Sequence, residues 1–111
     1  DVMDMISIEC NDKPGFIVNR VLLPMINEAI YCYENGTSDA KSIDTALKVG
    51  ANHPMGPLEL ADFIGLDTCL SILRILQKDF NDAKYKPCPL LEEYVQCGKL
   101  GRKTKEGFYK Y

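Results

Sequence analysis

The segment from Phe16 to Glu34 restricts the fold of this chain more than any other feature. Hydrophobic residues recur in it at the three- and four-residue spacing of an α-helix, and they form two stripes. These stripes are Phe16, Leu23, Ile26 and Ile30, and Ile17, Val21, Met25 and Ala29. A helix with two apolar stripes is expected to be buried on most sides. Pro24 lies inside the segment and removes a backbone donor, so the sequence predicts a kink there.

Four shorter helices are predicted downstream, each from residues that start or stop helices. Thr37–Asp39 offers caps for the first and Gly50 stops it. Pro57 suits the start of the next and Gly65 its end. Asp67 is expected to cap a fourth helix, and the fifth runs from Pro89 to Cys97 before Gly98. The sequence therefore predicts an all-α domain of about five helices.

The buried faces of these helices follow from the same periodicity. The residues expected to face inward are Ala40, Ile43, Ala46, Leu47, Leu70, Leu73, Leu76, Phe80, Leu91, Tyr94 and Val95. Residues 81–89 contain two prolines and little periodicity, which predicts a loop. Ile6 to Cys10 is a short β-prone stretch, so a strand-like lead-in is expected before the helices.

Length and charge exclude several classes of protein. A chain of 111 residues fits one domain and can bury a sizeable core. The net charge of −3 argues against a general nucleic-acid-binding protein. No apolar run approaches the roughly 20 residues of a membrane span, and the acidic start is unlike a secretory signal. We therefore expect neither a nucleic-acid partner nor a membrane partner.

Cysteines and motifs narrow the chemistry further. The five cysteines include no C-x-x-C pair, so reduced thiols in an intracellular compartment are expected, with Cys32 and Cys69 as small core residues. The chain contains no G-x-G-x-x-G, no phosphate-binding P-loop and no H-E-x-x-H. We therefore predict no cofactor-binding residues and no metal ligands in this chain.

A few polar residues remain as candidates for function. The single histidine, His53, precedes a proline and has no obvious orienting partner, so a loop residue is the simpler interpretation. Lys99, Arg102, Lys103 and Lys105 could meet an anion, but a solvated surface explains them as well. Asn19 shares the face of Phe16, Leu23 and Ile26, where a buried amide needs a partner. Arg20 shares another face with Glu28, which suggests a polar seam with an ion pair.

Three motifs together resemble the C-terminal domain of 3-hydroxyacyl-CoA dehydrogenases, and the bacterial 3-hydroxybutyryl-CoA dehydrogenases look most similar. The motifs are DKPGFIVNRVLLPMINEA at 12–29, GANHPMGPLELADFIGLD at 50–67 and GRKTKEGFYKY at 101–111. The resemblance implies a helical fold like the C-terminal domain of 6-phosphogluconate dehydrogenase. It also implies that residues 13–111 form a domain for substrate binding and dimerisation, while residues 1–12 are the remnant strand and linker of a missing Rossmann domain.

The resemblance also implies the chemistry. The family oxidises 3-hydroxyacyl-CoA to 3-ketoacyl-CoA with NAD, in fatty-acid β-oxidation or butanoate metabolism, and its Rossmann domain binds NAD and carries the catalytic histidine. Asn19 matches the active-site asparagine of the GFIVNR motif, so Asn19 is the expected catalytic residue here. The helical domain would form one wall of the acyl-CoA cleft and the homodimer interface. The compartment would be cytoplasmic in bacteria or the mitochondrial matrix in eukaryotes, and this chain alone would be inactive.

One position departs from the family pattern, and two other functions stay open. The family usually has glycine where this chain has Lys105, which puts the geometry of the last turn in doubt. The chain could instead be a stand-alone, non-catalytic helical module that binds acyl-CoA or another protein. It could also belong to another NAD-dependent dehydrogenase with a related helical domain. The GFIVNR and NHPMGPLEL strings favour the first interpretation.

Overall fold

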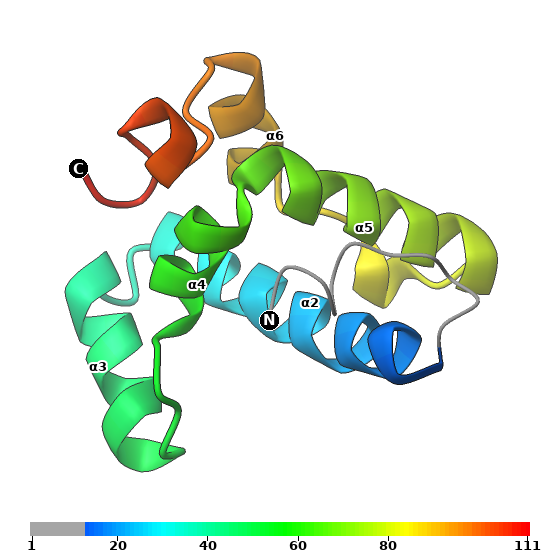
Figure 1. The fold of residues 1–111 in the computed structure, drawn as a ribbon, viewed down its shortest axis with the longest axis horizontal. Helices are drawn as coiled ribbons and strands as arrows, with labels where there is room; N and C mark the ends of the chain where they lie inside the picture. The colour runs from blue at the N-terminus through cyan, green and yellow to red at the C-terminus, as the bar shows by residue number, and fades with distance from the viewer. Residues whose placement is uncertain (1–12) are drawn as a thin grey trace.

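Helix α2, from Lys13 to Glu34, is the element against which the other helices pack. The computed structural model describes the backbone of residues 13–111 and the side chains of residues 17–111. Within that part the chain forms five α-helices and no strand, which confirms the predicted all-α fold (Figure 1). The other elements are α3 Ala40–Gly50, α4 Pro57–Ile64, α5 Leu66–Phe80, the 3-10 helix η1 Ala83–Tyr85, α6 Pro89–Gln96 and the 3-10 helix η2 Arg102–Thr104. The predicted lead-in at Ile6–Cys10 and the linker at 1–12 lie outside the described residues.

The long helix differs from its prediction in two ways. It begins at Lys13 rather than Phe16, because Pro14 fits the first turn of a helix, where its missing N–H is not needed. It runs through Pro24 and ends at Glu34, as predicted. The second difference is that only the first predicted apolar stripe is buried throughout its described part, whereas the second is buried at Ala29 and exposed at its start.

The buried stripe includes Leu23 and Ile26, which have no exposed surface. In the second stripe Ile17 is 59% exposed and Val21 is 69% exposed. The prediction of a helix buried on most sides was therefore wrong for the N-terminal half of α2. An apolar face of that size on a small domain indicates an interaction surface.

Helix α3 turns a polar residue toward the core. Asp39 caps it by accepting a hydrogen bond from the Ser42 amide at 2.8 Å. Ala46 was predicted to face inward, but it is exposed, because the buried side of the helix is centred on Ile43 and Asp44. Asp44 therefore occupies a buried position of α3 at which periodicity would predict an apolar residue.

The junction between α4 and α5 is a single residue, Gly65. Its φ of +107° is one that side chains rarely adopt, and its amide donates to the Ala61 carbonyl to close α4. The prediction that Asp67 caps α5 was wrong, because α5 already begins at Leu66. Asp67 lies in the first turn of α5 and forms an ion pair with Lys103 at 2.6 Å. Of the predicted core residues of α5, Leu70, Leu73 and Leu76 are buried and Phe80 is half-buried.

Residues 81–89 are more ordered than the sequence suggested. They include η1, whose Tyr85 is only 1% exposed and packs against Phe80 with ring centroids 5.6 Å apart. Hydrophobic periodicity could not predict this burial, because Tyr85 is a single aromatic residue in an otherwise polar segment. Tyr85 therefore belongs to the core although it was predicted to be part of a loop.

The C-terminal residues fold back on α4 rather than continuing away from it. Two isolated bridges join Gly101 to Glu106 and Glu106 to Lys110. The 3-10 helix η2 lies between Gly101 and Glu106 in the sequence. Lys105 has a φ of +66° and a ψ of 8°, the left-handed conformation that the family's usual glycine would adopt freely. The lysine therefore occupies a left-handed turn despite its side chain.

Asn27 joins α2 to the segment before α6. It is 3% exposed, its Nδ2 donates to the Lys86 carbonyl at 2.8 Å, and its Oδ1 accepts from the Cys88 amide at 2.8 Å. One side chain thus satisfies two backbone groups that belong to no helix hydrogen bond. Unsatisfied buried polar groups cost about 1–3 kcal/mol each.

We predict that Asn27→Ala lowers the free energy of unfolding by about 3 kcal/mol, because both backbone groups lose their partner. Urea denaturation measures this change, and Lys78→Ala on the exposed face of α5 serves as the control. The control should change the free energy by less than about 0.5 kcal/mol. Equal losses in the two variants would show that the bridge made by Asn27 does not stabilise the fold.

Two buried thiols add a pH dependence to the core. Burial raises the pKa of Cys69 to about 12 and that of Cys88 to about 11, from an ordinary value of 9.0. A protonated buried thiol therefore contributes stability that is fully present below pH 9 and is lost as the pH rises through 11 to 12. Cys32, the other cysteine predicted to lie in the core, is half-buried.

We predict that the free energy of unfolding falls more steeply above pH 9 in the wild-type chain than in Cys69→Ala. The difference in slope should approach about 1.4 kcal/mol per pH unit, the value for one proton. Chemical denaturation between pH 8 and about 10.5 measures both slopes. Cys97→Ala removes an exposed thiol and should keep the wild-type slope; parallel curves for wild type and Cys69→Ala would refute the prediction.

Candidate functional site

An apolar pocket of about 490 Å³ lies between α2 and the start of α4. Three residues of α2 form one side of it, and the loop before α4 and α4 itself form the other. The lining residues are Val18, Leu22, Met25, His53, Pro54, Met55, Leu60 and Phe63. A shallower depression of about 400 Å³ shares four of these residues and extends over Ile17 and Val21. The exposed apolar face of α2 is thus continuous with the pocket.

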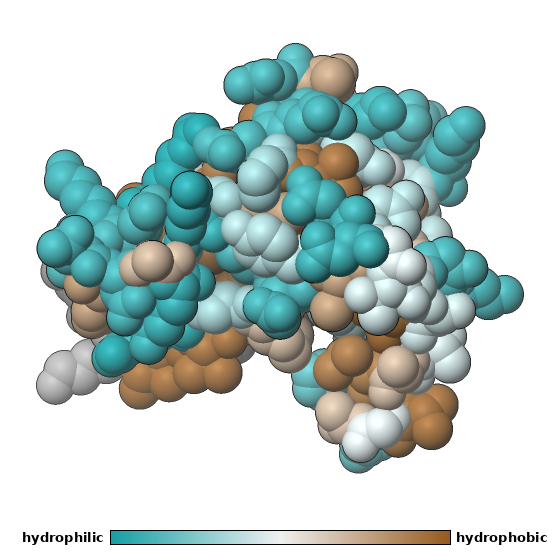
Figure 2. Space-filling view, turned by 180° about the vertical axis from the view of Figure 1, so that it is seen from behind, coloured by the Kyte–Doolittle hydropathy of each residue, from teal (hydrophilic) through white to brown (hydrophobic). Residues whose placement is uncertain are grey.

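The surface around this pocket is hydrophobic, and the surface further away is hydrophilic (Figure 2). Figure 2 shows hydrophobic surface gathered along the lower edge of the molecule, over α2 on one side and the end of α3 with its following loop on the other, with a hollow between them. The upper part of that face is hydrophilic. An apolar concave surface rimmed by polar ones is where ligands or partner surfaces bind.

Asn19, the predicted catalytic residue, lies on the buried side of α2, directly after Val18 of the pocket wall in the sequence. It is 8% exposed, so the domain encloses most of the residue. Leu23, one turn further on, is fully buried on the same side of the helix. Asn19 is therefore held by the core and does not itself line the apolar pocket.

His53 lies on the pocket wall, which the sequence did not indicate. It is half-buried in the loop after α3, and its backbone amide donates to the Leu47 carbonyl at 3.2 Å. The prediction of a loop residue is confirmed. The sequence could not place it beside α2, because that contact depends on how α3 and α4 fold back.

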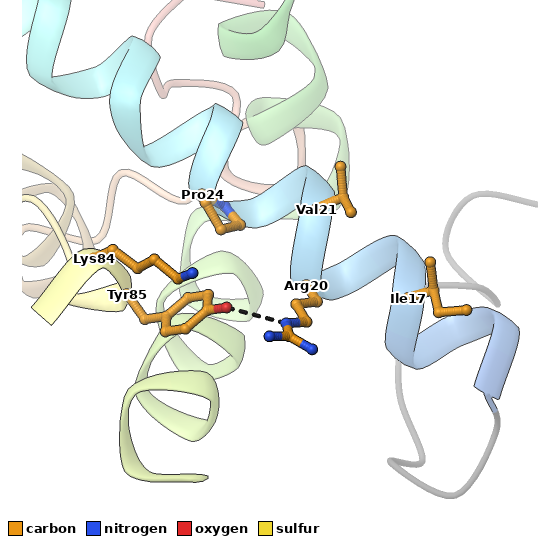
Figure 3. Close-up of a pocket in the computed structure, with 6 residues that line it drawn as sticks. All are labelled: Ile17, Arg20, Val21, Pro24, Lys84 and Tyr85. Carbon is orange, nitrogen blue, oxygen red and sulfur yellow. Dashed lines mark hydrogen bonds between the residues drawn. The ribbon is translucent and has the colours of Figure 1, made fainter. Parts of the chain in front are cut away.

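A second pocket, of about 450 Å³, carries positive charge and shares Ile17 and Val21 of α2 with the shallower depression. Arg20 and Lys84 line it with Ile17, Val21 and Pro24 (Figure 3). The Arg20 Nε donates to the Tyr85 hydroxyl at 3.3 Å, and its guanidinium lies 4.4 Å from the centre of the Phe80 ring.

The predicted ion pair between Arg20 and Glu28 was wrong within the described chain. The two aromatic rings hold the Arg20 guanidinium instead, and Glu28 stays exposed on the same helix. Arg20 is therefore a cation fixed in place by uncharged groups.

The basic cluster near the C-terminus is neutralised by nearby acids. Lys99 lies 3.7 Å from Glu106, and Arg102 lies 3.8 Å from Glu59. Lys103 pairs with Asp67, and Lys105 is exposed. These pairs support the interpretation of a solvated surface rather than a phosphate site.

Within residues 17–111 the side chains do not fit a dinucleotide or a metal. Pyrophosphates need glycines that let backbone approach the ligand at a helix start. The close approaches of Gly56, Gly101 and Gly107 are instead to Asp44 and Asp62 of the protein itself. Among the described residues no group of three or more histidine, cysteine or acidic side chains could hold a metal ion. None of the helices in this part of the chain is long and apolar enough to cross a membrane.

Comparison with known proteins identifies the family. The model of the C-terminal domain of 3-hydroxyacyl-CoA dehydrogenases matches residues 15–111. A 3-hydroxybutyryl-CoA dehydrogenase of Bradyrhizobium diazoefficiens is 65% identical over 100 residues, which is 90% of this chain and 34% of that protein. The human mitochondrial hydroxyacyl-coenzyme A dehydrogenase is 49% identical over 105 residues, 94% of this chain and 33% of that protein.

Solved structures agree with the sequence comparisons. The crystal structure of an (S)-3-hydroxybutyryl-CoA dehydrogenase from Ralstonia eutropha superposes with a TM-score of 0.85 at 52% identity, covering 88% of this chain and 35% of that one. The chain spans about a third of the length of the relatives it matches. Taken with the helical fold and the three motifs, these matches show that the chain belongs to the 3-hydroxyacyl-CoA dehydrogenase family and corresponds to its C-terminal domain.

Proposed function

We propose that this chain supplies one wall of the acyl-CoA cleft and the dimer interface of an NAD-dependent 3-hydroxyacyl-CoA dehydrogenase. NAD and the Rossmann domain that binds it would belong to the rest of the whole protein, since the residues present here do not fit the cofactor. The observation that carries the proposal is the apolar pocket on α2, whose wall includes Val18, the residue before the buried Asn19.

The pocket suits the acyl part of the substrate. Its walls are almost wholly apolar, and its volume of about 490 Å³ is in the usual range for small-molecule sites. An apolar chain placed there leaves water, while the thioester end would lie toward the rest of the protein. A short acyl chain such as the 3-hydroxybutyryl group of several relatives is therefore the proposed ligand of this pocket.

The proposal makes Asn19, which follows Val18 of that pocket in the sequence, a neutral hydrogen-bond donor to the substrate. The Nδ2 of an asparagine can donate to the oxygen on C3 of the substrate without adding a charge. Such a donor strengthens as charge develops on that oxygen in a cleft with little water. The proposed role of Asn19 is therefore to hold the C3 oxygen in line and to stabilise its charge.

We predict that Asn19→Ala in the full-length protein lowers kcat for 3-hydroxybutyryl-CoA by about 10²-fold or more, the usual scale for losing one such donor. NADH affinity should change little, because Asn19 would not touch the cofactor. Steady-state kinetics and cofactor titration measure both quantities. The present chain, tested alone with acetoacetyl-CoA and NADH, should give no turnover and serves as the blank.

The outcome also separates function from folding. Asn35→Ala, an exposed asparagine at the end of α2, should leave kcat and melting temperature unchanged. If Asn19→Ala unfolds the protein while the folded fraction keeps full kcat, Asn19 only satisfies the core. A turnover by the blank would contradict the assignment of the cofactor to the rest of the protein.

The exposed stripe of α2 is the proposed homodimer interface. Two α2 helices packed antiparallel about a two-fold axis at Pro24 would bury Ile17 and Val21 against the partner. Arg20 and Glu28 are each four positions from Pro24, so the same axis would place Arg20 opposite Glu28 of the partner subunit. Both side chains are exposed on this face, which makes it self-complementary in charge as well as apolar.

We predict that the wild-type chain is dimeric at micromolar concentration and that Val21→Asp makes it monomeric, because the substitution places a charge in the apolar stripe. Sedimentation equilibrium measures the oligomeric state of each variant. Val49→Asp is the matched control, since Val49 is 79% exposed on α3, away from the stripe, and this variant should remain dimeric. A concentration-independent wild-type monomer would count against the interface.

The cellular compartment is proposed from the relatives and from the cysteines. The relatives include bacterial proteins and a human mitochondrial one. Four cysteines in the described part of this chain are free thiols. These facts support a reducing intracellular compartment.

A further inference from the structure

Residues 101–111, which we call the C-terminal strap, are held by a buried carboxylate of α4. Asp62 is 1% exposed and accepts hydrogen bonds from the amides of Phe108 and Tyr109 at 3.0 Å each. It also accepts from the Tyr111 hydroxyl at 2.7 Å. Burial raises the pKa of Asp62, and these hydrogen bonds oppose the rise. Two amides and a hydroxyl of the strap thus donate the hydrogen bonds that this buried carboxylate would otherwise accept from water.

A second buried carboxylate joins the strap to α3. Asp44 is 3% exposed and accepts from the amides of Leu58 and Glu59, which lie in the first turn of α4, at 2.8 and 3.0 Å. Its Oδ2 accepts from the Tyr109 hydroxyl at 2.6 Å. Asp44 therefore caps α4 from another helix, and Tyr109 holds the cap.

The strap and α4 lie so close together that two glycines of the strap have no room for a side chain. A Cβ on Gly101 would clash with the Asp62 carbonyl oxygen, and a Cβ on Gly107 would clash with the Asp62 Oδ1. The neighbouring Phe108 is buried and stacks on Tyr94 with centroids 5.0 Å apart. The strap is therefore fastened on both sides, to the carboxylate and to the aromatic core.

The other side of α4 forms the apolar pocket. Leu60 and Phe63 line it, on either side of Asp62 in the sequence. Arg102 of the strap lies over the Phe63 ring at 5.3 Å and is 3.8 Å from Glu59 of the same helix. The strap contacts the pocket wall from behind and does not line the pocket itself.

From this arrangement we infer that the C-terminal strap positions α4 and so sets the shape of the acyl pocket, with Tyr109 and Tyr111 as positioning residues. The inference rests on the proposed function, because it assigns the acyl chain to the pocket. The physical reason is that α4 has only eight residues, too few to be a stable helix by itself. Its place depends on the groups that cap and clamp it.

The test uses the double variant Tyr109→Phe with Tyr111→Phe in the full-length protein, which removes two hydroxyls and keeps both rings. Hydrogen exchange of the Leu58 and Glu59 amides should become about 10-fold faster, while the amides of the α5 core keep their rates. KM for 3-hydroxybutyryl-CoA should rise about 10-fold with kcat within about 2-fold, because the reacting groups are untouched. Lys110→Ala, between the two tyrosines and exposed, is the control and should change neither quantity.

Each other outcome overturns the inference in a defined way. Unchanged exchange would show that the hydroxyls do not hold α4, and faster exchange with unchanged KM would show that the pocket does not depend on α4. Faster exchange in α5 as well would indicate general destabilisation. If the double variant does not fold, Tyr111→Phe alone is judged by the same criteria. A wild-type protein without dehydrogenase activity would refute the proposed function, and exchange would still decide whether the strap holds α4.

Discussion

Leu23, Ile26 and Ile30 of α2 are buried completely in a domain where α2 contacts every other α-helix of the described chain. Each of these side chains contributes about 1.5–3 kcal/mol when it leaves water. The shorter helices, of eight to fifteen residues, are marginal in water by themselves and depend on tertiary packing against α2 and one another. The position of each later element is therefore defined relative to one face of α2.

Buried polar side chains determine how the segments of the chain are arranged around the apolar core. Asn27, Asp44 and Asp62 are buried, and each is bonded to backbone groups distant in sequence. None of the three has an ion-pair partner within the described residues, so backbone amides and tyrosine hydroxyls replace the lost water. Because such groups are costly when unsatisfied, they allow only one arrangement of the segments they join.

The division of α2 into a buried and an exposed face gives the domain its functional surface. The exposed face carries Ile17 and Val21 and passes into the apolar pocket, while Asn19 lies on the buried face with Leu23 and Ile26. The core therefore holds Asn19, and only its neighbour in the sequence, Val18, lines the pocket. The proposed dimer and cleft would both cover the exposed apolar surface.

The sequence by itself determined the helical class and the approximate helix bounds, because periodicity, prolines and glycines act locally. The resemblance of its three motifs indicated the family. It also singled out Asn19, but only through its motif. Tertiary structure alone decided that Ala46 is exposed while Asp44 is buried, that Tyr85 belongs to the core, and that His53 and Phe63 share a pocket with α2. These contacts join residues far apart in the chain, and their free energy depends on packing and on hydrogen-bond partners that no local pattern encodes.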